Sequence, residues 1–135
     1  MEMTIRTMAG NYAAAWSSQN AASVASYFAT DGSLEINTNA PAVGRAAITA
    51  SAQSFMTAFP DMVVSMARLT VDDSSAVFHW TLKGTNAGPG GTGKAVRFSG
   101  YEEWTIGANG LIQTSLGHYD EVEYQRQLKE GISVS

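Results

Sequence analysis

The spacing of apolar residues changes at Pro60, and this change constrains the fold of the 135-residue chain more than any other feature. Before Pro60, apolar side chains recur every three or four residues, which predicts helices, and after it they alternate, which predicts strands. Helices followed by consecutive strands are typical of an α+β domain, in which the helices cover one face of an antiparallel sheet. We therefore expect residues 1–135 to form a single domain of this class.

Helical spacing predicts three helices in the first half of the chain. The first ends near residues 17–18, a short second helix includes Val24, Tyr27 and Phe28, and the third spans residues 45–58 and is stopped by Pro60. The apolar residues that repeat in the first and third helices are Ile5, Met8, Tyr12, Trp16, Ile48, Ala52, Phe55 and Phe59.

Strands dominate the second half of the chain. Strand candidates occupy residues 33–36, 62–71, 76–84, 95–106 and 111–120, and residues 121–130 are expected to form a short closing helix. Polar and glycine-containing turns at residues 72–75 and 108–110 indicate hairpins, whereas the glycine-rich segment 86–93 indicates a longer connection.

In the predicted strand over residues 76–84, successive side chains alternate between two faces. Phe78, Trp80 and Leu82 share the face that is expected to point into the core. His79 belongs to the opposite face, where the sheet is expected to pack against a second subunit.

Glu102 shares a face with Phe98 and Trp104 on the next strand. If this face is the inner one, loss of water among aromatic neighbours raises the pKa of the carboxyl group and favours its protonated form. The alternative is that Glu102 pairs with Arg97 or Arg68 at the rim of the sheet.

The last strand carries a histidine and an aspartate two residues apart. Strict alternation places His118 and Asp120 on the same inner face as Ile112, Thr114 and Leu116, which predicts an acid/base pair lining a pocket. Two structural alternatives remain open. Asp120 fits the N-cap position of the closing helix, and His118 fits a buried neutral histidine that donates to a backbone carbonyl.

Composition excludes several other functions. The chain has no cysteine, two histidines, eight basic residues and a net charge of −4, so we expect no disulfide, no metal, no cofactor and no nucleic-acid partner. The segment 88–93 lacks the strand–glycine–helix context of a nucleotide-binding loop. No apolar stretch approaches the ~20 residues of a membrane span, and we expect a cytoplasmic protein that does not bind membranes.

Short motifs in a fixed order support a family resemblance. They are Asp31-Gly32, Gly44-Arg45-Ala46-Ala47-Ile48, Phe59-Pro60-Asp61, Trp80-Thr81-Leu82-Lys83-Gly84-Thr85, Thr92-Gly93-Lys94, and Asp120 followed by Gln127-Leu128. Together they resemble the SnoaL-like family, which includes polyketide cyclases and belongs, with the ketosteroid isomerases, to the nuclear transport factor 2-like superfamily. The resemblance implies a cone-shaped, strongly curved mixed sheet wrapped around about three N-terminal helices, with a deep apolar pocket. It also implies a homodimer formed through the outer face of the sheet.

The resemblance also implies roles for individual residues. In SnoaL-like cyclases an aspartate near the end of the last strand is the general acid/base of an intramolecular aldol step, and Asp120 stands at that place, with His118 as a second proton donor. In the ketosteroid isomerases a tyrosine and a protonated acid bind the oxyanion, and Tyr12 and Glu102 stand at their positions. The base of those isomerases is missing here, because Ile36 occupies its position.

Two functions follow as hypotheses. The first is an enzyme that performs cyclase- or isomerase-type acid/base chemistry on a hydrophobic carbonyl compound, such as a polyketide or a steroid-like ring. The second is a non-catalytic module that uses the same cavity to bind a small ligand or part of a protein partner. The residues predicted to surround the substrate in either case are Tyr12, Trp16, Phe55, Phe59, Phe78, Trp80, Glu102 and Trp104.

Overall fold

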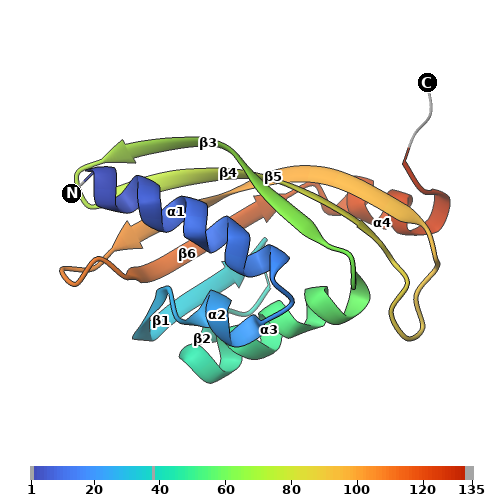
Figure 1. Ribbon diagram of the computed structural model, residues 1–135, viewed down its shortest axis with the longest axis horizontal. Helices are drawn as coiled ribbons and strands as arrows, with labels where there is room; N and C mark the ends of the chain where they lie inside the picture. Colours follow the sequence, from blue (N-terminus) through green and yellow to red (C-terminus); the bar gives the residue numbers. More distant parts are fainter. Residues whose placement is uncertain (1, 38, 133–135) are drawn as a thin grey trace.

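The computed structural model describes residues 2–37 and 39–132 of the chain (Figure 1). Its elements are α1 (Glu2–Ser17), α2 (Ala21–Ala25), β1 (Phe28–Ile36), β2 (Ala42–Val43), α3 (Arg45–Ala58), β3 (Val63–Asp72), β4 (Ser75–Thr85), β5 (Ala95–Ile106), β6 (Ile112–Tyr119) and α4 (Glu121–Glu130). The strands form one sheet in the order β2-β1-β6-β5-β4-β3. Strands β1 and β6 run parallel, and the other neighbouring strands run antiparallel.

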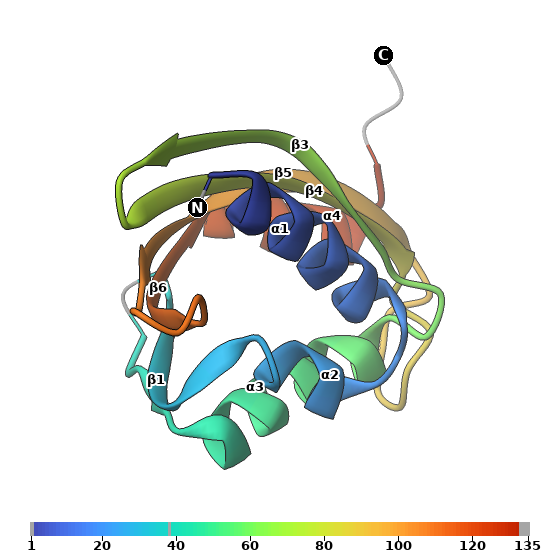
Figure 2. The same cartoon turned by 60° about the vertical axis from the view of Figure 1, so that its left-hand side comes forward.

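The sheet bends strongly and surrounds α1 on its concave side (Figure 2). Helices α2 and α3 lie next to β1 and β2, across from β3 and β4 (Figure 2). The sheet does not close, because its order ends at β2 on one edge and at β3 on the other. The predicted α+β class, with a curved mixed sheet around N-terminal helices, is confirmed.

Helix α1 supplies the centre of the core. Ile5, Ala9 and Tyr12 follow one another at intervals of four and three residues, so they share one face of the helix, and each is fully or almost fully buried. The Tyr12 ring meets the rings of Phe78 and Trp104 edge-on, with centroids 5.5 and 5.3 Å apart. The N-terminal helix is therefore fixed by residues of β4 and β5.

Helix α2 is shorter than the sequence pattern predicts. The Asn20 side chain caps its start by accepting a hydrogen bond from the Ser23 backbone N–H, and the helix ends at Ala25. Phe28, expected in the helix, begins β1 and pairs with Ile112 of β6. Sheet pairing with a distant strand overrides the local helical spacing here. The third helix and the closing helix have the predicted bounds.

A bulge in β6 reverses the predicted orientation of that strand. Ile112 pairs with Ile106 and Thr114 pairs with Thr105, so Gln113 is an extra residue between them. From this point the inner face carries Ser115, Gly117 and Tyr119 instead of Thr114, Leu116 and His118. Leu116 is 42% exposed, whereas Ser115 is fully buried. The expectation that Ile112, Leu116, His118 and Asp120 share one inward face is therefore wrong.

Candidate functional site

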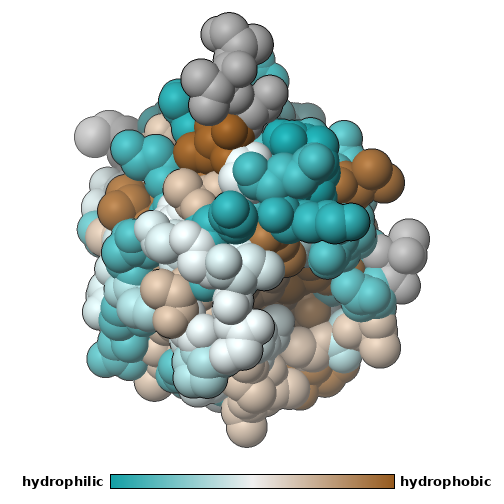
Figure 3. Space-filling view, turned by 90° about the vertical axis from the view of Figure 1, so that its right-hand side faces the viewer, coloured by the Kyte–Doolittle hydropathy of each residue, from teal (hydrophilic) through white to brown (hydrophobic). Residues whose placement is uncertain are grey.

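An apolar pocket lies between the concave face of the sheet and the helices α1 and α3. Its cavity volume is about 50 Å³. Its aromatic walls are Trp16, Phe55, Phe78, Trp80, Phe98 and Tyr119, and its aliphatic walls are Leu34, Ile36, Val64 and Leu82. Figure 3 shows a hydrophobic recess in the end of the molecule where α4 lies, below a group of hydrophilic residues. Such an apolar hollow with few polar groups is typical of a small-molecule site.

Glu102 is the acidic side chain in the pocket wall, and it is only 7% exposed. Three donors point to the same oxygen of its carboxyl group. The Ser115 hydroxyl donates to Oε1 at 2.7 Å, and the Tyr12 hydroxyl and the Trp104 indole N–H each donate to it at 3.0 Å. No other described residue forms a hydrogen bond to Oε2, so Oε2 is the carboxyl oxygen available to a molecule in the pocket.

Burial controls the protonation of this cluster. Loss of water raises the pKa of Glu102, and this effect is larger than the opposing effect of the hydrogen bonds from Trp104, Ser115 and Tyr12. Burial, together with the charge of Glu102, also raises the pKa of the Tyr12 hydroxyl well above its ordinary value. Tyr12 therefore stays a neutral donor, and Glu102 is a weaker acid than an exposed glutamate.

The indole N–H of Trp16 is a second polar group in the wall. It opposes the rise in the pKa of Tyr12, so it lies near that hydroxyl group. Its geometry nevertheless falls outside that of a hydrogen bond, and it has no partner among the described residues. We regard the contact as electrostatic, because an N–H that is poorly aligned with its acceptor contributes little as a hydrogen bond.

Two glycines on the inner face make room for the site. Gly100 lies opposite Trp80, and a Cβ atom there would come within 2.3 Å of the His118 backbone oxygen and 2.5 Å of the Trp80 ring. Gly117 lies opposite Glu102, and a Cβ atom added to Gly117 would lie 3.7 Å from the Cγ atom of Glu102. Gly100 thus permits the Trp80 ring to cross β5, and Gly117 keeps the space next to Glu102 open.

The structure divides the predicted substrate-binding residues into two groups. Trp16, Phe55, Phe78, Trp80 and Glu102 line the pocket. Three others are buried but are not among the lining residues: Tyr12, Phe59 and Trp104. Tyr12 and Trp104 act on Glu102 instead, and Phe59 packs against Tyr124, with ring centroids 6.4 Å apart. The expected direct contact between Tyr12 and an oxyanion is therefore not the arrangement found.

Asp120 is exposed and caps α4. Its carboxylate accepts a hydrogen bond from the Glu123 backbone N–H at 3.1 Å, and its backbone has the extended conformation of an N-cap residue. The structure therefore supports the capping interpretation of this residue and not its predicted place in the pocket. The reason is that β6 ends at Tyr119, so Asp120 does not continue the alternation of the strand.

The His118 ring is on the outer face of the sheet. Its Nε2 atom lies 2.7 Å from Oε2 of Glu103, and its ring is tilted by 32° against the Tyr101 ring, with centroids 4.7 Å apart. Glu103 and Tyr101 both point away from the core, whereas Glu102 between them points inward. The bulge at Gln113 therefore moves His118 out of reach of a ligand as an acid/base group, although the residue borders the pocket.

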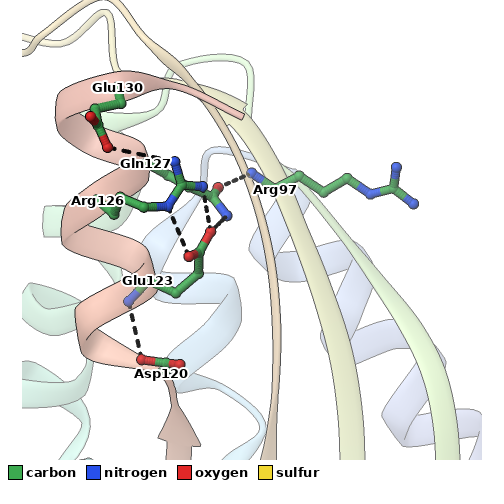
Figure 4. Close-up of polar contacts among 6 residues, drawn as sticks. All are labelled: Arg97, Asp120, Glu123, Arg126, Gln127 and Glu130. Atoms are coloured by element: carbon green, nitrogen blue, oxygen red, sulfur yellow. Dashed lines mark hydrogen bonds and ion pairs between the residues drawn. The ribbon is translucent and has the colours of Figure 1, made fainter. Parts of the chain in front are cut away.

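Polar contacts join α4 to β5 (Figure 4). Glu123 accepts two hydrogen bonds from Arg126, at 2.9 and 2.7 Å, and one from the Gln127 amide at 2.7 Å. The same amide accepts the Arg97 backbone N–H at 2.6 Å, while the Arg97 side chain points away from α4 (Figure 4). Glu123 therefore fixes the amide that connects the helix to the strand.

Sequence reasoning missed Ser115, Gly117 and Phe98 as site residues. Phe98 could have been included, because it shares its predicted face with Glu102. Ser115 and Gly117 could not, because their inward orientation depends on the bulge at Gln113, for which the sequence has no recognisable signal.

Within residues 2–37 and 39–132, no three histidine, aspartate or glutamate side chains converge as metal ligands would. The same part of the chain contains no helix that is long and apolar enough to span a membrane.

Solved structures with low sequence identity share this fold. A protein of Catenulispora acidiphila, described as having a ketosteroid isomerase-like fold and solved in complex with trimethylamine, superposes with a TM-score of 0.79 at 17% identity, covering 93% of this chain and 92% of that one. SalBIII, described as an epoxide hydrolase/cyclase-like enzyme with a role in pyran ring formation in the polyether salinomycin, gives a TM-score of 0.77 at 16% identity, covering 90% and 95%. At these identities the likeness shows the fold alone.

A search of curated proteins found no match. The model of the SnoaL-like domain matches residues 9–114, which include all strands from β1 to β5 and most of α1. The chain therefore belongs to the SnoaL-like domain family.

Proposed function

We propose that the pocket binds a hydrophobic small molecule with a carbonyl oxygen, and that protonated Glu102 donates a hydrogen bond to that oxygen through Oε2. The observation that carries the proposal is the arrangement of the carboxyl group. Three donors occupy Oε1, Oε2 has no hydrogen bond to a described residue, and the side chain lines an apolar pocket. A buried carboxyl group with a raised pKa is a suitable donor to an enolate or alkoxide oxygen.

This arrangement supports a narrower chemistry than the predicted acid/base pair. Among the described residues that line the pocket, Glu102 is the carboxyl group, while Asp120 is exposed and the His118 ring is held by Glu103. The step that Glu102 can assist is the delivery of a proton to oxygen, as in the closure of a ring by an aldol reaction of a polyketide-like substrate. The cyclase-like description of SalBIII is consistent with this proposal.

The first experiment tests whether the pocket recognises an acceptor oxygen. Acetophenone and α-methylstyrene have nearly the same shape, but only the ketone has an oxygen that can accept a hydrogen bond. We expect acetophenone to bind about fivefold more tightly, as measured by chemical-shift titration of backbone amides, because one buried hydrogen bond contributes ~1 kcal/mol. Equal binding of the two compounds would contradict the proposal.

Two variants make this test specific. In Glu102→Gln the amide oxygen still accepts the three donors and the amide nitrogen still donates into the pocket, so the preference for acetophenone is expected to remain. In Glu102→Leu the preference is expected to disappear. Glu103→Leu, which changes the neighbouring carboxylate on the outer face, is the matched control and should leave the preference unchanged.

A second experiment distinguishes an enzyme from a binding module. 2,6-Heptanedione closes by an intramolecular aldol reaction to 3-hydroxy-3-methylcyclohexanone. Hydroxide from solvent removes a methyl proton, the carbon–carbon bond forms, and the new alkoxide oxygen takes the proton of Glu102, which regains a proton from water. An enzyme is expected to accelerate this closure, and Glu102→Gln should abolish the acceleration while retaining binding, because an amide donates a hydrogen bond but not a proton. Binding without acceleration favours the non-catalytic module.

We also propose that two copies of the chain associate through the outer face of the sheet. Arg68, His79, Tyr101 and His118 lie directly opposite one another across β3, β4, β5 and β6 and form a row that we call the outer row. Arg68 Nη2 lies 3.3 Å from His79 Nε2, and the rings of His79 and Tyr101 are 5.7 Å apart. Burial and the nearby Arg68 charge lower the pKa of His79, which favours a neutral ring in this row.

Charge on the outer face supports this association. Lys83 of β4 and Arg97 of β5 lie opposite each other on one side of the outer row. Glu103 lies on the other side of the row, where it lines the same surface hollow as Asp72. The two ends are about 20 Å apart, because six strand residues separate them. A two-fold axis near the outer row places the basic end of one copy over the acidic end of the other, so the face is complementary to itself.

A further inference from the structure

The bulge at Gln113 places a serine hydroxyl in the core. Without the extra residue, the inner position of β6 opposite β5 would be filled by Leu116 or Thr114. With it, Ser115 is fully buried, and its hydroxyl donates to Oε1 of Glu102 at 2.7 Å, the shortest of the three hydrogen bonds to that atom. A buried hydroxyl group is costly unless it is hydrogen-bonded, so this contact accounts for the serine.

The three donors decide where the proton of Glu102 resides. They come from α1, β5 and β6 and converge on Oε1, which already receives a hydrogen from each. If the acidic proton were bound to Oε1, it would be repelled by these three hydrogens, which lie close to it. The proton of the neutral acid therefore belongs on Oε2. Oε2 is also the oxygen without a hydrogen bond to any described residue.

We propose that Ser115 is a positioning residue, which directs the acidic proton of Glu102 into the pocket. The inference rests on the proposed function of Glu102 and adds the residue that orients it. When the proton passes to a ligand oxygen, the Oε2–H bond breaks, the ligand O–H bond forms and Glu102 becomes a carboxylate. The hydroxyl of Ser115 then donates to a charged acceptor, which strengthens this hydrogen bond and favours the transfer.

Of the three residues that donate to Oε1, Ser115 can be substituted with the least damage to the core. Tyr12 and Trp104 are large, buried rings that pack against each other, so truncating either one creates a cavity. Ser115→Ala removes one oxygen atom. Ser115→Cys refills the space that alanine leaves with a slightly larger atom, and it replaces a strong donor by a weak one, so the two variants change packing in opposite directions while both weaken the hydrogen bond.

The test follows the side-chain carboxyl carbon of Glu102 by NMR through a pH titration of the full chain, with the resonance assigned by its absence in Glu102→Gln. We expect Ser115→Ala and Ser115→Cys each to lower the acid dissociation constant of Glu102 roughly tenfold, because a hydrogen bond to the ionised form is lost. Thr114→Ala, which removes a hydroxyl from the outer face of the same strand, is the matched control and should leave the titration unchanged.

The acetophenone preference provides a second readout. With two donors on Oε1 instead of three, the proton is less strictly confined to Oε2, and we expect the preference over α-methylstyrene to fall roughly threefold in both Ser115 variants. If Glu102→Leu abolishes the preference while both Ser115 variants titrate and bind like the wild type, the inference is wrong and the proposed function stands. If Glu102→Leu leaves the preference intact, the proposed function itself is overturned.

Discussion

Glu102 combines two opposing effects in one residue. The enclosure by apolar walls penalises its charge, while three hydrogen bonds favour the charge, and the enclosure has the larger effect on its pKa. The side chain therefore keeps its proton to a higher pH than an exposed glutamate does. Its surroundings also set the direction of that proton, because every donor approaches the same oxygen.

This raised pKa predicts a pH dependence of stability. The folded state holds the Glu102 proton more tightly than the unfolded state, so the stability from this group is full below the ordinary glutamate pKa and declines as pH rises through the raised value. Glu102→Gln should remove this decline in urea unfolding measured over a pH series. Glu103→Gln is the control that should retain it, and parallel curves for Glu102→Gln and the wild type would contradict the assignment.

The two inner-face glycines predict contrasting costs for the same substitution. Gly100→Ala is expected to destabilise the fold by about 3 kcal/mol, because the added carbon would overlap a backbone oxygen that cannot move freely. Gly117→Ala should cost much less, since its nearest neighbour would be 3.4 Å away. Denaturant unfolding of the two variants checks the difference, and equal losses would show that the space around Gly100 is not constrained as described.

At the scale of elements, β6 shows what the sequence could and could not predict. The helix over residues 45–58 and the long strands were predictable, because their apolar residues repeat over many positions and Pro60 separates the two periods. The same alternation placed Phe78 and Trp80 on the inner face correctly. It grouped Glu102 with Phe98 and Trp104 but left open whether that face is the inner one, which the structure shows it to be. It failed after Gln113, because one extra residue reverses every following side chain and the alternative register leaves no trace in the pattern.

Helix α4 is expected to depend on Glu123 for its attachment to β5. The hydrogen bonds from Arg126 and Gln127 lower the pKa of Glu123 to about 2, so the attachment is present above the ordinary glutamate pKa of 4.5 and is lost as pH falls through about 2. Glu123→Ala should lower the hydrogen-exchange protection of the α4 amides at neutral pH. Glu130→Ala, which removes only a 3.7 Å ion pair with Arg126, is the control and should have little effect.

At the scale of the whole molecule, the outer face predicts an association that depends on salt. Leu116→Lys adds a charge to the 42% exposed side chain on that face and is expected to shift the chain to monomers in sedimentation equilibrium. Val122→Lys changes a side chain that is 81% exposed on α4 and should leave association unchanged. Raising the salt concentration should weaken association, because exposed charges are screened. Monomers at all salt concentrations would contradict the proposal.

The central position of α1 also bears on how the chain is made. The ribosome releases this helix before β4 and β5, so Phe78 and Trp104, which enclose Tyr12, are translated many residues later. During that interval the apolar side of the helix has no native surface to cover it, and such surfaces promote aggregation. Tyr12 therefore reaches its buried position only after β4 and β5 have been synthesised.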